Sequence, residues 1–158
     1  MSAQSWWKGE RGEWYVVLQA GLFLLVALGP RSAPGLPAWL PPGSPLGAWA
    51  GAALLSVGLA LVIAGVVRLG RGLTALPYPK DDGTLIVGGA YAFVRHPMYS
   101  GGIFAAVGWA LWVHGALTLC YAAALFVFFD VKSRREERWL AEYAGYRGRV
   151  RKLIPLVY

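Results

Sequence analysis

Two short polar segments of an otherwise apolar chain contain the side chains best suited to chemistry. Arg95 and His96 stand directly before Pro97, a residue that favours the first turn of a helix. Glu136 and Glu137 follow the last long apolar run. Together, a guanidinium, a titratable imidazole and two carboxylates would form a charged site, provided that the fold brings the two segments together.

The composition is that of a membrane protein. Of the 158 residues, 57% are apolar and only 15% are charged, and the mean hydropathy is +0.49. An ordinary soluble domain has about 25% charged residues, so this chain lacks the polar surface needed to cover a core in water. Eight Trp and eight Tyr residues suit rings placed at two membrane interfaces. We predict a single integral membrane domain over residues 1–158.

Charge and cysteine content argue against other classes of protein. The net charge of +7 could suit nucleic acid, but the basic residues lie beside apolar runs and in the tail, where anionic headgroups are closer. We therefore predict membrane lipids as partners and no nucleic acid. Cys120 is the only cysteine, which excludes a multi-cysteine metal site, and no metal is predicted. The N-terminal stretch MSAQSWWKGERGEW lacks the apolar core and cleavage site of a signal peptide.

The apolar runs predict an all-α membrane protein with about four transmembrane helices. The first two helices are expected over Trp14–Leu28 and Leu46–Val67. The run Met98–Phe129 is too long for one span and is interrupted at His114-Gly115, which predicts a tight helical hairpin with arms of about 15 residues. Whether such short arms cross the whole bilayer stays open. A cytoplasmic amphipathic helix over Lys132–Gly148 is expected to follow.

The distribution of basic residues predicts the orientation of these helices. Of the fifteen Lys and Arg residues, only Arg31 falls in the two loops expected outside the cytoplasm, the proline-rich loop 29–45 and the His114 turn. Basic loops stay on the cytoplasmic side of a membrane. We therefore predict an integral, multi-pass protein whose two termini and polar segment face the cytoplasm.

The hairpin decides whether the two polar segments can form one site. If it closes, its two ends meet, and Arg95 and His96 come close to the two glutamates. In the alternative, the cations only anchor helices to headgroups, and the glutamates form surface ion pairs with Arg134 or Arg138. The residues themselves leave both possibilities open.

Four segments resemble the motifs of one family of membrane enzymes. Residues 89–101 read GAYAFVRHPMYSG and resemble the G-x-Y-x-x-V-R-H-P-x-Y-x-G signature of the isoprenylcysteine carboxyl methyltransferase and phospholipid methyltransferase superfamily. Residues 74–79 (TALPYP) resemble its T-x-x-P-x-P lead-in, and residues 135–140 (REERWL) its E-E-x-x-L motif. Residues 143–155 (YAGYRGRVRKLIP) are similar to its closing Y-x-x-Y-x-x-x-V-x-R-L-I-P motif.

The resemblance implies methyl transfer from S-adenosylmethionine to a lipophilic or membrane-embedded acceptor. The acceptors it allows are a prenylcysteine-like carboxylate, a lipid headgroup amine and a thiol. It also implies a cofactor-binding core over residues 73–158, preceded by N-terminal helices over residues 1–72 that vary with the acceptor. Lys152 stands where the family usually has arginine, and the segment between Glu137 and Tyr143 is shortened.

Individual residues acquire roles from the same resemblance. Arg95, or His96 when protonated, would pair with the carboxylate of the cofactor, and Glu137 or Glu136 would take its ammonium group. Methyl transfer depends on in-line placement more than on acid–base power, so no catalytic triad is expected. The residues implied for catalysis are Arg95, Glu137 and Lys152. The residues implied for cofactor binding are Val87, Gly89, Tyr91, Arg95, His96, Pro97, Tyr99, Glu136, Glu137, Tyr143 and Tyr146.

Two other interpretations stay open. The R-H-P-x-Y-x-G segment also resembles the C-terminal part of sterol reductases and related membrane reductases, which use NADPH. A non-catalytic membrane subunit is the other possibility. The oligomeric state is open as well, because the second predicted helix carries glycines that permit close packing within one chain or between two. These glycines are Gly47, Gly51, Gly58 and Gly65.

Overall fold

The computed structural model describes residues 12–36, 44–73, 85–139 and 143–158, and this part of the chain is helical. Its α-helices are α1 (Glu13–Leu28), α2 (Pro45–Leu69), α3 (Pro97–Trp112), α4 (Ala116–Trp139) and α5 (Tyr143–Arg147). Two short 3-10 turns, η2 (Gly70–Gly72) and η3 (Gly89–Ala92), precede the site. The predicted all-α class is confirmed for the described residues. The motif at residues 74–79 and part of the proline-rich loop lie outside them.

Proline and glycine set the helix boundaries. Pro45 and Pro97 each occupy the first turn of a helix, where a missing N–H costs nothing. The predicted hairpin between α3 and α4 is confirmed: His114 adopts a φ of 52°, and the Gly115 N–H closes the turn onto the Ala110 carbonyl at 3.0 Å. The site segment before Pro97 is therefore fixed at the start of a buried helix.

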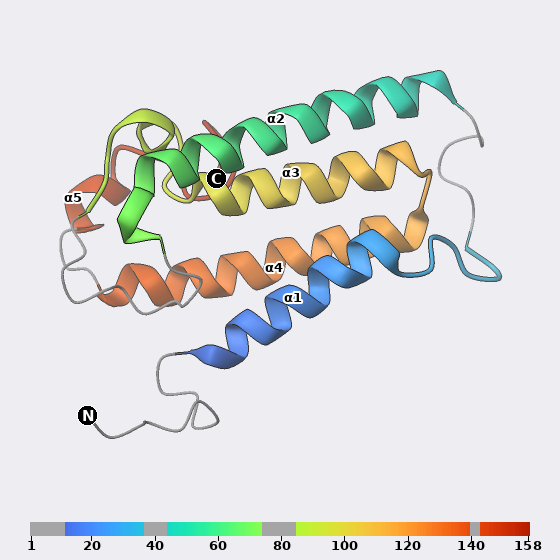
Figure 1. The fold of residues 1–158 in the computed structure, drawn as a ribbon, viewed down its shortest axis with the longest axis horizontal. Helices are drawn as coiled ribbons and strands as arrows, with labels where there is room; N and C mark the ends of the chain where they lie inside the picture. The colour runs from blue at the N-terminus through green and yellow to red at the C-terminus, as the bar shows by residue number, and fades with distance from the viewer. Residues whose placement is uncertain (1–11, 37–43, 74–84, 140–142) are drawn as a thin grey trace.

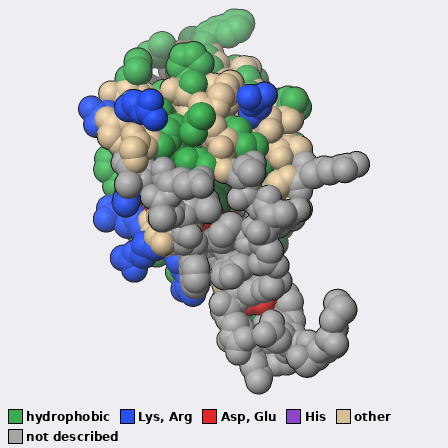
Figure 2. Space-filling view, turned by 90° about the vertical axis from the view of Figure 1, so that its left-hand side faces the viewer, with side chains coloured by type: hydrophobic (Ala, Val, Ile, Leu, Met, Phe, Trp, Pro, Cys, Tyr) green, Lys and Arg blue, Asp and Glu red, His purple; other side chains and the backbone are tan. Residues whose placement is uncertain are grey.

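The helices form a layered arrangement along the long axis of the molecule (Figure 1). Helix α2 packs on α3, α4 packs on α3, and α1 lies across α4. The start of α1, helix α5 and the C-terminal residues lie at one end, on the left of Figure 1. Figure 2 shows this end face-on, with Lys and Arg side chains and apolar side chains both visible on its described surface.

Facing glycines let α2 and α3 approach at backbone distance. A Cβ added at Gly58 would lie 2.6 Å from the Gly101 carbonyl oxygen, and one added at Gly51 would lie 2.7 Å from that of Gly108. Real Cβ atoms do not approach so closely, so only glycine fits at these crossings. Gly51 and Gly58 therefore allow close helix packing within one chain. This was one of the two predicted possibilities, the other being packing between two chains.

Within the described residues, two helices are long and apolar enough to cross a bilayer, α2 and the Ala116–Arg138 part of α4. Only 17% of the most apolar stretch of α2 is buried inside the molecule, so a long apolar surface is left for lipid. Helix α1, with 16 residues, is apolar but shorter. The count of about four spanning helices stays a prediction.

The second arm of the hairpin differs from the prediction. Helix α3 has 16 residues, close to the expected length, but α4 has 24. It runs without a break through Lys132, where a separate surface helix over Lys132–Gly148 was expected. That boundary was wrong because Lys132, Ser133 and Glu137 are buried, so the helix continues inside the fold. Beyond α4, the structure has the short helix α5.

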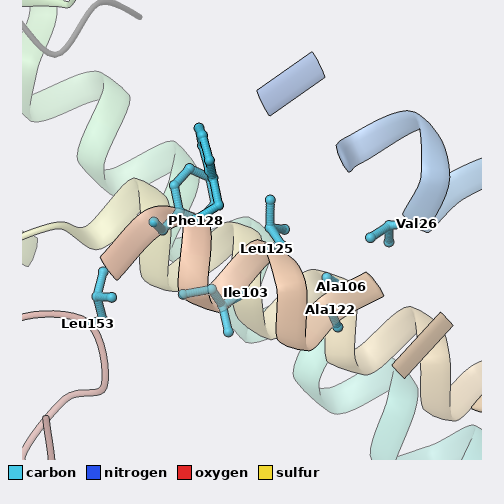
Figure 3. Packing of buried hydrophobic residues seen from close by; sticks show 8 residues of the cluster. Val26, Ile103, Ala106, Ala122, Leu125, Phe128 and Leu153 are labelled. Atoms are coloured by element: carbon cyan, nitrogen blue, oxygen red, sulfur yellow. The ribbon is translucent and has the colours of Figure 1, made fainter. Parts of the chain in front are cut away.

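The apolar core lies between α1, α3 and α4, and Figure 3 shows its packing. The C-terminal tail contributes one residue, the fully buried Leu153. This contact fastens the tail to the helices beside the polar segment. The core residues are Val26, Ile103, Ala106, Ala122, Leu125, Phe128, Phe129 and Leu153.

Candidate active site

The C-terminal tail pairs with the segment that precedes α3. Val94 and Arg151 form an isolated parallel bridge. The Arg95 N–H donates to the Arg151 carbonyl at 2.8 Å, and the His96 N–H donates to the Lys152 carbonyl at 3.2 Å. These backbone bonds hold Arg95 and His96 against the tail and turn their side chains toward α4.

Glu137 of α4 is the centre of the site. Its side chain is 0% exposed, and its Oε1 atom accepts from Arg95 Nε at 2.9 Å. His96 Nε2 lies 3.0 Å from the same oxygen. On the other side, Arg147 Nε lies 3.0 Å from Oε2. The predicted meeting of the two polar segments is confirmed, and the alternative of surface pairing fails, because Glu137 is buried among these cations.

The Arg95 guanidinium is held by the chain itself. Besides Glu137, it donates from Nη1 to the Val150 carbonyl at 2.6 Å and to the Arg147 carbonyl at 3.2 Å. Arg95 is buried, so these neutral acceptors replace water around its charge. Arg95 therefore links the Glu137 carboxylate to the backbone of the C-terminal tail and fixes its position.

Glu136 forms the second half of the polar group. Tyr99 Oη donates to Glu136 Oε1 at 2.5 Å, and His96 Nδ1 lies 3.5 Å from Glu136 Oε2. His96 thus lies between two carboxylates, one beside each ring nitrogen. Only the imidazolium form carries protons on both nitrogens, and that form suits both neighbours.

Aromatic rings connect the polar group to the apolar core. The Tyr99 ring stacks on His96 with a centroid distance of 5.4 Å and on Phe129 with one of 4.4 Å. Phe129 in turn packs against Phe23 of α1 and Phe128 of α4. Tyr99 therefore has its hydroxyl in the charged cluster and its ring at the edge of the apolar interior.

Two buried tyrosines join the tail to η3. The Tyr146 hydroxyl donates to the Tyr91 carbonyl oxygen. Burial raises the pKa of each phenol to about 12, so both stay neutral well beyond the ordinary range of tyrosine. Tyr143 begins α5, and its side chain lies outside the described part of the structure. These contacts place Tyr146 in the same group as Tyr91.

The remaining residues predicted for the cofactor lie in the segment before α3 and at the start of that helix. Val87 is half exposed, and Gly89 has a φ of +66°, a conformation that favours glycine. Pro97 is buried at the start of α3. The Arg68 side chain lies against Gly88, where a Cβ would meet its Nη2 atom at 2.8 Å. The glycines therefore leave room for a side chain beside the backbone.

Lys152 is the predicted residue that the structure does not bring into this group. Its ammonium forms an ion pair with Asp130 and lies 5.0 Å from the centroid of the Tyr158 ring. Asp130 stands seven positions before Glu137, about 10 Å along α4. The backbone of Lys152 positions His96, whereas its side chain belongs to a separate cluster with Arg134.

Sequence reasoning missed three contributors. Arg147 contacts Glu137, and the buried Lys132 donates a hydrogen bond to the partly buried Gln19 beside Tyr99. The spacing of Lys132 and Glu136 by four residues was a usable signal, because such residues share one face of a helix. Nothing in the local sequence marks Gln19, whose partner lies 113 positions away.

Comparison with known proteins identifies the family. Residues 46–146, more than half of the chain, match the model of the phospholipid methyltransferase family. The chain belongs to this family, within the superfamily that the motifs indicated. The match begins in α2 and ends in α5, so it covers the hairpin and most of the site.

Named relatives within the superfamily are isoprenylcysteine methyltransferases. The chain is 31% identical over 111 residues to the protein-S-isoprenylcysteine O-methyltransferase of Schizosaccharomyces pombe, covering 65% of this chain and 47% of that protein. It is 32% identical over 116 residues to a probable protein-S-isoprenylcysteine O-methyltransferase of Oryza sativa subsp. indica, covering 64% and 61%. The chain thus spans about half to three fifths of the length of these relatives.

The fold also matches a solved structure. A eukaryotic intramembrane Ras methyltransferase, the isoprenylcysteine carboxyl methyltransferase, superimposes with a TM-score of 0.60 at 17% identity. The match covers 99% of this chain and 55% of that one. At this identity the likeness concerns the fold, and it agrees with an integral membrane protein.

Proposed function

We propose that this protein transfers the methyl group of S-adenosylmethionine to a lipophilic acceptor whose reacting group is a carboxylate of the prenylcysteine type. The observation that carries the proposal is the buried Glu137 carboxylate, held by Arg95 and His96 at 2.9 and 3.0 Å. The printed names of the relatives, which are O-methyltransferases of isoprenylcysteine, support the choice of acceptor.

The residues present fit the charged end of this cofactor. Glu137 Oε2 is buried and has no hydrogen-bond partner among the described residues; its contact with Arg147 Nε at 3.0 Å is an ion pair without hydrogen-bond geometry. The Arg147 side chain is half exposed, so it is free to yield to a ligand from the aqueous side. An ammonium group supplies the donors that this oxygen lacks. Glu137, with Glu136 beside it, would hold that ammonium.

Other side chains would bind the rest of the cofactor. His96 in its protonated form offers a charge to a carboxylate, and Arg95 keeps the Glu137 carboxylate oriented by its bonds to the tail. Tyr91 and Val87, with the backbone at Gly89, would flank an adenosyl group. Tyr99 presents a ring to the reacting centre from the side of the apolar core.

When bound, the cofactor supplies an electrophilic methyl group on a sulfonium. One bond forms between an acceptor carboxylate oxygen and the methyl carbon, the bond from that carbon to sulfur breaks, and its electron pair stays on sulfur. No proton moves, so the chain needs no general base for a carboxylate acceptor. The residues of the site act by holding the two partners in line and excluding water.

The topology follows from the same chemistry. A charged, water-soluble cofactor must reach the site from an aqueous compartment, and an acceptor with a lipid chain from the bilayer. We therefore place the end of the molecule that carries the Glu137 cluster at the cytoplasmic surface, in agreement with the excess of Lys and Arg on that side. Both termini would lie on the same side.

Calorimetry with S-adenosylhomocysteine tests the proposal on the purified protein in detergent. We expect binding to wild type and a loss of at least about tenfold in affinity for Glu137→Gln, because a charge-assisted hydrogen bond is removed. NADPH is the competing probe: binding of NADPH in place of S-adenosylhomocysteine would favour a membrane reductase. Binding of neither molecule would favour a non-catalytic subunit.

A further inference from the structure

A buried cation lies within the membrane-spanning part of α4. Lys132 is 1% exposed and stands in the Ala116–Arg138 segment, which is apolar enough to cross a bilayer. It lies one helical turn before Glu136, so it is closer to the middle of α4 than the charged cluster of Glu136 and Glu137 is. Neither the motifs nor the cofactor proposal uses this side chain.

The Lys132 ammonium is placed by two other helices. Its Nζ atom donates to Oε1 of Gln19, in α1, at 2.7 Å. The same atom lies 5.1 Å from the centroid of the Tyr99 ring, in α3. Glu136 interacts with it electrostatically from the next turn of α4. The ammonium therefore lies where α1, α3 and α4 meet, next to the ring that separates the charged cluster from the apolar core.

A charge in this position is not explained by stability. Burying an ammonium beside a neutral glutamine and an aromatic ring, with Glu136 one helical turn away, is costly in an apolar helix. Hydrophobic residues in place of a buried ion pair are often neutral or stabilising for a fold. An ionisable residue inside a membrane segment therefore points to a ligand or a transport path.

We propose that Lys132, held in place by Gln19, binds the carboxylate of the methyl acceptor. This inference rests on the proposed function and adds the residue that recognises the acceptor. Tyr99 contacts both sides: its hydroxyl bonds to Glu136 of the cofactor cluster, and its ring adjoins the Lys132 ammonium. A carboxylate at Lys132 would thus lie on the bilayer side of Tyr99, and the cofactor on the aqueous side.

The charge of Lys132 also selects the acceptor and releases the product. An ammonium repels a protonated headgroup amine and attracts a carboxylate. Transfer of the methyl group converts that carboxylate to a neutral ester, which no longer has the charge that Lys132 attracts. The acceptor therefore binds more tightly than the product, and product inhibition should be weak.

Gln19 makes α1 part of the acceptor site. Helix α1 lies outside residues 46–146, the part of the chain that matches the family model. A side chain from a helix outside that match thus sets the position of a cation beside the family's motif residues. Changes in α1 should accordingly alter the acceptor specificity and leave cofactor binding intact.

Steady-state kinetics on the full chain test the proposal, with an S-farnesylated N-acetylcysteine as acceptor and its carboxamide as competitor. Lys132→Met should raise the acceptor KM about ten- to a hundredfold and abolish the preference for carboxylate over carboxamide, while S-adenosylhomocysteine affinity stays unchanged. Lys132→Arg should restore much of the KM. Arg138→Met, which removes an exposed cation from the same helix, is the matched control and should leave KM at the wild-type value.

Gln19→Glu separates this role from a structural one. It keeps, and strengthens, the link between α1 and α4, so a purely structural contact predicts an unchanged KM. The proposal predicts a higher KM, because the new carboxylate occupies the ammonium in place of the acceptor. Wild-type KM in both Lys132→Met and Gln19→Glu would overturn the inference. Failure of wild type to bind S-adenosylhomocysteine would overturn the proposed function, which is a distinct result.

Discussion

Arg95 and Glu137 are 42 positions apart in sequence, yet Arg95 Nε lies 2.9 Å from Glu137 Oε1 in a buried ion pair. The pair connects the residue before α3 with the end of α4, the two ends of the hairpin. Breaking such a pair leaves one charge buried without its partner, which costs more than the pair itself contributes. Arg95 and Glu137 should therefore be sensitive positions for both folding and ligand binding.

The first prediction concerns the ion pair as a structural link. Arg95→Met should lower the thermal unfolding midpoint in detergent by at least several degrees, because Glu137 is left buried beside fewer donors. Differential scanning calorimetry measures the midpoint. Asp130→Asn is the matched control on the same helix: Asp130 is partly exposed, so the loss should be smaller. An equal or larger loss for Asp130→Asn would contradict this ranking.

The second prediction concerns the hydrogen bond from Tyr146 to the Tyr91 carbonyl. Tyr146→Phe keeps the ring and removes the hydroxyl, so a buried carbonyl loses its donor at a cost of about 1–3 kcal/mol. Chemical unfolding in detergent measures the change. Tyr158→Phe removes a hydroxyl that bonds to Asp130 at an exposed site, and it should cost less. If both variants lose the same free energy of unfolding, the Tyr146 hydrogen bond does not stabilise the fold more than the exposed Tyr158 bond does.

The third prediction is a loss of stability in alkali. The pKa of Tyr146 is raised to about 12 by burial, whereas an unfolded tyrosine ionises near pH 10. Between these values the unfolded phenol loses its proton and the folded one keeps it. The contribution to stability is therefore complete below pH 10 and disappears as the pH rises toward 12. Unfolding midpoints from pH 9 to 12 should fall less steeply for Tyr146→Phe than for wild type; parallel curves would speak against the raised pKa.

The fourth prediction tests the contact between α2 and α3. Gly58→Ala places a methyl group 2.6 Å from the Gly101 carbonyl oxygen, so the helices must separate, at a cost of about 1–3 kcal/mol. Gly21→Ala in α1 is the matched control, because a Cβ there has no heavy atom within 4 Å. Thermal unfolding should show a lower midpoint for Gly58→Ala than for the wild type. Gly21→Ala should not lower the midpoint. A harmless Gly58→Ala would mean that the two helices pack less closely than described.

Sequence reasoning located the helices where composition changes sharply. The starts of α2 and α3 at Pro45 and Pro97 and the turn at His114 could be predicted, because proline, glycine and charge mark these boundaries. The end of α4 could not. Lys132 and Ser133 appear polar in the sequence, and only the tertiary packing shows that both are buried.

The charged cluster was predictable in part for a similar reason. Two polar segments at the ends of a hairpin must meet, so the contact of Arg95 and His96 with Glu137 follows from topology. The carbonyls of Arg147 and Val150 that hold Arg95 belong to the backbone, and no side-chain pattern signals them. The pairing of the Lys152 side chain with Asp130 could not be predicted, because a motif position fixes a residue's place in the sequence but not the partner of its side chain.

The most direct test of the account is transfer of a labelled methyl group by the purified wild-type chain. S-adenosylmethionine labelled in its methyl group is incubated with the protein in detergent and an S-farnesylated N-acetylcysteine, and the extracted lipid is analysed for label. We predict a base-labile methyl ester with wild type and a loss of about tenfold or more in its rate of formation with Glu137→Gln. Absence of any labelled ester, under conditions in which the protein is folded, would contradict the account.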